Sequence, residues 1–63
     1  MDKKTWDRLL PLRMATKGWA FTHDDFLRAK LKYAEEVLLS LPEDLRVVGK
    51  ELVTPIREAV ALL

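Results

Sequence analysis

Apolar residues recur at helical spacing through the middle of the chain. At 100° per residue, the positions of one series lie within about 40° of a single line on a helix, as in a core-facing stripe. Charged residues occupy the opposite side, so the sequence predicts a helix over residues 22–40. The apolar series, spaced alternately by four and three, is Leu27, Leu31, Ala34, Leu38 and Leu41.

The start of this helix has a recognisable cap. We expect Thr22 to cap it by accepting from backbone N–H groups, while Asp25, three positions on, reaches back in a capping box. Phe21 and Phe26 stand at the two positions of a hydrophobic staple.

A second helix is predicted over residues 42–62, capped by Ser40 and with Pro42 in its first turn. So short a connection makes the two helices an antiparallel hairpin. The apolar residues before and after Pro55 fall on the same side of a helix, which favours one helix that is kinked at Pro55. Gly49, beside the stripe, is expected to let a neighbouring helix approach closely. The stripe is Leu45, Val48, Leu52, Ile56, Ala59 and Leu63, and Leu52 is expected to be fully buried, like Leu31 and Leu38.

The first twenty residues carry a weaker pattern. A short helical segment is expected from a cap at Thr5 to Lys17, with Gly18 as its stop, although Pro11 interrupts the middle. Arg13 falls on its apolar face, whereas Leu10 and Met14 point elsewhere. That face comprises Trp6, Leu9, Leu12 and Thr16. The whole chain, 1–63, is thus expected to form one all-α domain, a three-helix bundle.

Size and composition favour association. A domain of 63 residues buries only about 60% of the surface of its unfolded chain. Small domains therefore rely on disulfides, metals, oligomerisation or very good helix packing. With no cysteine and one histidine, only the last two remain. Because 49% of the residues are apolar, more than a lone bundle easily hides, we expect a homodimer.

Charge and composition also bear on location. Residues 1–21 hold five cations and two anions, a net +3, whereas the whole chain carries +1.

No apolar stretch approaches the roughly 20 residues of a membrane span, and no signal peptide is recognisable, so a cytoplasmic location is expected. The absence of asparagine and glutamine, with 33% charged residues, is typical of thermophilic proteins.

Catalytic chemistry is not indicated. His23 stands beside Asp24 and Asp25, but adjacent helical residues point about 100° apart and do not share one ion. We expect His23 to pack over the end of the core instead. Ser40, the only serine, already has a capping role. We therefore expect no enzyme activity, no metal, no cofactor and no small-molecule substrate.

Several aromatic and cationic residues are candidates for partner binding. Phe26, Tyr33 and Val37 form a second apolar strip beside the core stripe, to be covered by the N-terminal segment or by another chain. Lys30 falls among them, either as a stem that covers apolar surface or as an interface charge. The N-terminal aromatics either close the core or form a recognition surface. The candidate residues are Trp6, Arg8, Arg13, Trp19, Phe26, Lys30, Tyr33 and Val37.

Two classes of function fit these features. The first is a helical protein-interaction module, acting as a subunit, adaptor or inhibitor of a larger protein. The second is a small DNA-binding regulator of helix-turn-helix type that uses the basic N-terminal segment. The second is disfavoured, because Asp24 and Asp25 would face phosphates and the chain has no asparagine or glutamine to read adenine.

Overall fold

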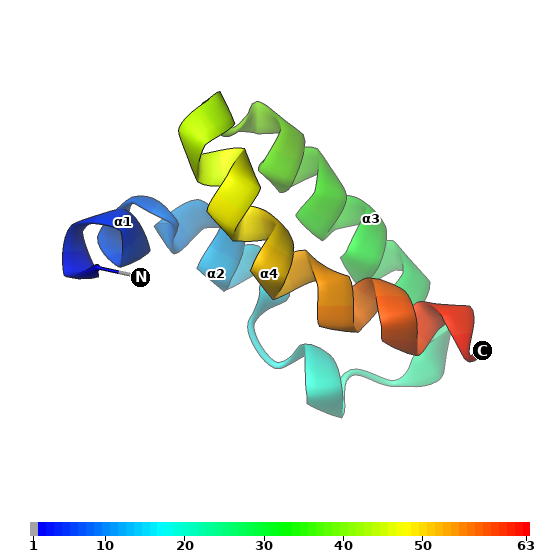
Figure 1. Cartoon of the computed structure of the whole chain (residues 1–63). Helices are drawn as coiled ribbons and strands as arrows, with labels where there is room; N and C mark the ends of the chain where they lie inside the picture. Colours follow the sequence, from blue (N-terminus) through cyan, green and yellow to red (C-terminus); the bar gives the residue numbers. More distant parts are fainter. Residues whose placement is uncertain (1) are drawn as a thin grey trace.

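The structure is a computed structural model that describes residues 2–63, and 84% of it is helical, with no strand in this part of the chain. Helices α2, α3 and α4 pack against one another, and α1 lies to one side of them (Figure 1). The all-α architecture predicted from the sequence is confirmed. The elements are α1 (Lys3–Arg8), α2 (Leu10–Thr16), the 3₁₀ turn η1 (Trp19–Phe21), α3 (Asp24–Ser40) and α4 (Glu43–Ala61).

The two long helices form the predicted hairpin. Only Leu41 and Pro42 separate α3 from α4, and the helices run antiparallel, side by side (Figure 1). Pro55 lies inside α4, which continues to Ala61 and changes direction near its middle (Figure 1). The Thr54 hydroxyl donates to the Lys50 carbonyl at 2.8 Å, so Thr54 sits within a helical turn and does not cap a new helix.

The cap of α3 differs from the prediction. His23 occupies the N-cap position and its Nδ1 accepts from the Asp25 N–H at 3.2 Å. The Thr22 hydroxyl instead donates to the Gly18 carbonyl at 3.1 Å. The predicted Thr22–Asp25 capping box is therefore wrong, because the preceding turn engages Thr22. His23 was also predicted to pack over the end of the core, and this is wrong. As the N-cap residue of α3, His23 has a side chain that is exposed to solvent.

Two further caps were also predicted wrongly. The Ser40 hydroxyl donates to the Val37 carbonyl at 2.6 Å, so Ser40 belongs to the end of α3, and Pro42 precedes α4 without a side-chain cap. At the N-terminus, Asp2 caps α1 by accepting from the Thr5 N–H at 2.8 Å. Thr5 itself lies inside α1.

The predicted helix over residues 5–17 is divided at Leu9. Pro11 stands in the first turn of α2, where a missing N–H breaks no helical hydrogen bond, so the chain restarts a helix there instead of continuing one. Gly18 adopts φ +72°, a left-handed conformation suited to glycine, and ends the segment as predicted.

The core lies between α2, α3 and α4. The stripe predicted on α3 is buried from Leu27 to Leu38, but that on α4 is rotated: Val53 is fully buried, Leu52 only partly, and Leu63 is exposed. The rotation arises because α4 packs against two helices and its buried arc includes Gly49. The buried apolar residues are Leu9, Leu12, Ala15, Leu27, Leu31, Ala34, Leu38, Leu45, Val53 and Ile56.

Candidate protein-binding site

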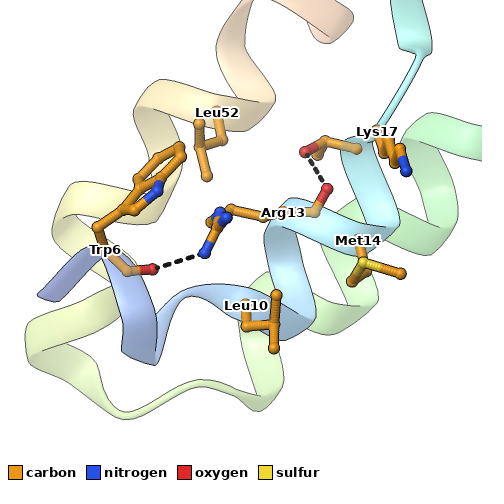
Figure 2. Close-up of a pocket in the computed structure, with 7 residues that line it drawn as sticks. Trp6, Leu10, Arg13, Met14, Lys17 and Leu52 are labelled. Carbon is orange, nitrogen blue, oxygen red and sulfur yellow. Dashed lines mark hydrogen bonds between the residues drawn. The ribbon is translucent and has the colours of Figure 1, made fainter. Parts of the chain in front are cut away.

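An apolar groove lies where α1, α2 and the middle of α4 meet. We call it the Trp6 groove, and its volume is about 350 Å³. Figure 2 shows Arg13 at its centre, with Trp6 and Leu52 on one side and Leu10 and Met14 on the other. The groove is lined by Trp6, Leu10, Arg13, Met14, Thr16, Lys17 and Leu52.

The wall of the groove is held by a contact between Trp6 and Arg13. The Arg13 guanidinium carbon lies 4.3 Å from the centroid of the Trp6 ring, within the range of a cation–π interaction. Arg13 Nη1 also donates to the Trp6 carbonyl at 3.4 Å (Figure 2). These two contacts fix α1 against α2 across the break at Leu9.

Thr16 is the buried member of the groove lining. Its hydroxyl donates to the Leu12 carbonyl at 2.9 Å, with the Arg13 carbonyl a second, longer acceptor at 3.3 Å. The Thr16 hydroxyl is therefore satisfied inside its own helix and leaves no polar group without a partner at this point of the lining.

The ionisable residues of the groove are both cationic. Within residues 2–63, the ion pairs between arginine or lysine and carboxylates are made by Arg8 and Arg57, so neither Arg13 nor Lys17 has a carboxylate partner. Trp6, Leu10 and Met14 are exposed beside them, Met14 with 62% of its surface open. The groove therefore combines exposed apolar area with unneutralised positive charge.

The candidate residues predicted from the sequence do not form one site. Trp6 and Arg13 meet in the groove, whereas Arg8 pairs with Asp44 on α4 at 3.0 Å and so fastens α1 to the bundle. Trp19 is partly buried and packs against the core, so it contributes to the packing of the helices. Four others lie along α3, namely Phe26, Lys30, Tyr33 and Val37.

The predicted strip on α3 is only partly covered. Val37 packs against the core and Lys30 is partly buried. Phe26 and Tyr33 remain exposed, so the N-terminal segment described here does not cover them.

Sequence reasoning missed most of the groove. Leu10 and Met14 were set aside because they point away from the core face of the N-terminal segment. Their spacing of four, on one exposed side of a helix, was the available signal. Leu52 was assigned to the core, and its partial exposure follows from the rotation of α4.

Residues 2–63 contain neither a cluster of metal ligands nor a membrane-spanning helix. No three His, Cys, Asp or Glu side chains there come close enough to hold a metal ion. None of the helices described is long and apolar enough to cross a membrane. Comparison of the chain with protein-family models, curated proteins and solved structures finds no match.

Proposed function

We propose that this chain is a non-enzymatic protein-interaction module that holds an acidic, amphipathic segment of a partner protein in the Trp6 groove. The observation that carries the proposal is the composition of the groove, which pairs exposed apolar side chains with two cations that lack carboxylate partners. Aromatic residues, methionine and arginine are the types enriched at protein interfaces.

The chemistry of the partner follows from this lining. Leu10 and Met14 offer apolar area to one side of a segment, and Arg13 and Lys17 favour carboxylates along its edge. Arg13 is already oriented by Trp6, so less side-chain freedom is lost when it binds. A short helix with an apolar face and flanking acidic residues has this complementarity.

The alternative is a DNA-binding regulator, and its geometry is less favourable. Seven residues, 17–23, connect α2 to α3, whereas helix-turn-helix motifs use turns of about 3–4 residues. Asp24 and Asp25 occupy the first turn of α3, the end that would enter the groove of the duplex.

The test compares two apolar-to-acidic substitutions at exposed sites. Met14→Glu places a negative charge in the Trp6 groove, and Phe21→Glu places one at a position that is 95% exposed and outside it. We expect a partner captured from native lysate by the wild type and by Phe21→Glu, but lost with Met14→Glu. Circular dichroism checks that both variants stay folded.

Binding experiments with the purified partner then test whether positive charge in the groove contributes to the affinity. Binding measured by calorimetry should weaken as salt rises and when Lys17 is replaced by glutamate. Capture indifferent to Met14→Glu, or binding indifferent to salt, would overturn the proposal. Submicromolar binding of a mixed-sequence duplex or single strand in fluorescence anisotropy, collapsing at higher salt, would instead promote the DNA-binding class.

A further inference from the structure

A second apolar surface lies on the outer side of the hairpin, near the turn between α3 and α4. Leu39 is 71% exposed and Val47 67% exposed, and both border a hollow of about 330 Å³. We call it the Val47 face. It is lined by Leu38, Leu39, Glu43, Arg46, Val47 and Lys50.

The Val47 face is separate from the Trp6 groove, and the two share no lining residue. Leu52, the α4 residue of the groove, and Val47 are five positions apart, which places them roughly 140° apart around the helix. Whatever covers one surface leaves the other open.

The charges of the Val47 face form an ordered row along α4. Glu43 and Lys50 are seven positions apart, so they lie nearly on one line of the helix, roughly 10 Å apart, with Val47 between them. Neither makes an ion pair within residues 2–63. The row therefore reads negative, apolar, positive from one end to the other.

Arg46 adds a second positive charge to this row. Its Nε is enclosed and has no hydrogen-bond acceptor among the residues described. That atom is closed to an incoming chain, so the contribution of Arg46 to the Val47 face is its charge: Arg46 and Lys50 are one turn apart and place two cations at the same end of the row. Two neighbouring cations attract a carboxylate more strongly than one, which favours an incoming acidic group here.

We propose that the Val47 face binds a second copy of this chain, with the two α4 helices antiparallel. A two-fold axis crossing α4 midway between Arg46 and Val47 places Glu43 opposite Lys50 of the partner subunit. The symmetry makes this pair twice. The carboxylate of Glu43 also lies near the positive charge of the partner subunit's Arg46, and Leu39 and Val47 of both copies are covered.

The row also sets the strength of the dimer. It spans only residues 43–50, about two helical turns, so the interface is smaller than the ≈ 800 Å² per partner of standard complexes. The dimer is weak, forming as the chain concentration rises from micromolar towards millimolar.

Charge exchange tests the proposed register. Glu43→Lys alone and Lys50→Glu alone each set like charges opposite one another and should leave the chain monomeric in sedimentation equilibrium. The double variant should recover the dimer, as should an equimolar mixture of the two single variants, which pairs lysine with glutamate at both contacts. Glu36→Lys, an exposed position on α3 outside the face, is the matched control and should dimerise like the wild type.

A single cysteine tests the position of the axis. The chain has no cysteine, so Val47→Cys introduces the only thiol. Close to the axis, two such residues meet and should form a disulfide-linked dimer on mild oxidation, whereas Phe21→Cys should link far more slowly.

The outcomes separate this dimer from the partner-binding function. The proposal is overturned if the wild type is monomeric at millimolar concentration, if the double variant and the mixture stay monomeric, or if Phe21→Cys links as fast as Val47→Cys. Loss of the dimer in the well-folded Met14→Glu variant would overturn it too, because it would place the second copy in the Trp6 groove.

Discussion

Replacing Gly49 with alanine probes how closely the three packed helices approach. A methyl group at this position would lie 2.9 Å from Leu12 Cδ2 and 2.9 Å from Leu38 Cδ1. Carbon atoms in contact prefer separations of about 3.5–4.0 Å, so both leucines would have to shift. Leu12 belongs to α2 and Leu38 to α3, and both are buried, which leaves little room on either side.

Two opposing effects decide whether Gly49→Ala stabilises or destabilises the fold. Alanine in place of glycine inside a helix gains about 1 kcal/mol of intrinsic propensity. Overpacking of a well-filled core costs about 1–3 kcal/mol. Because two buried side chains on different helices must move together, we take the upper half of that range, which leaves a net loss of about 1 kcal/mol or more. For a domain of this size, each kcal/mol lowers the melting temperature by about 4–8 °C.

Thermal unfolding followed by circular dichroism measures the effect, and a double-mutant cycle assigns it. Leu38→Val removes the methyl group that the alanine would strike, so in that background Gly49→Ala should cost less than in the wild type. Leu39→Val, its exposed neighbour, should give no such relief. A higher melting temperature for Gly49→Ala, or an equal penalty in both backgrounds, would refute the close approach of the helices.

Two other predictions concern the N-terminal segment. Leu9→Ala should lower the free energy of unfolding, measured by urea titration, by about 2–5 kcal/mol, because Leu9 is fully buried. Leu10→Ala should lower it by well under half as much, because Leu10 is exposed. Equal losses would contradict the placement of α2. Hydrogen bonding by Thr5, first through its side chain and then through its backbone N–H, holds the pKa of Asp2 below its ordinary 3.8. The cap therefore stabilises α1 above pH 3.8 and is lost as the pH falls through the lowered pKa. Thr5→Ala should bring the Asp2 pKa, measured by nuclear magnetic resonance, closer to 3.8.

The hairpin could be predicted because its signals are local. Leu27 to Leu38 keep a strict helical spacing without glycine or proline, so the stripe on α3 was found correctly. The stripe on α4 was centred on long apolar side chains, yet the buried arc there includes Gly49, which has no side chain to count. How far α4 turns depends on its contacts with α2, and a single-helix pattern carries no information on those contacts.

The caps failed for a related reason. Thr22 and His23 are adjacent, and either can accept from the first turn of α3. The left-handed turn at Gly18 decides between them, because it places the Gly18 carbonyl where the Thr22 hydroxyl donates to it. Side-chain preference at one position thus depends on backbone geometry four residues earlier.

The candidate sites show the same limit. Trp6 and Arg13 were both named from residue type, and their contact joins two helices whose break at Leu9 was not foreseen. Leu39 and Val47 were not named, because each lies outside the stripe of its own helix. Only the pairing of α3 with α4 brings them to one surface.

The two surfaces also fit together as one arrangement. Because the Val47 face and the Trp6 groove share no residue and lie on different sides of α4, a dimer built on the first leaves both copies of the second open. A two-fold assembly then presents two identical grooves, and a partner with two acidic segments would bind the second groove at a high effective concentration. A weak dimer is sufficient for this purpose, because a bivalent partner bound to both grooves would itself hold the two copies together.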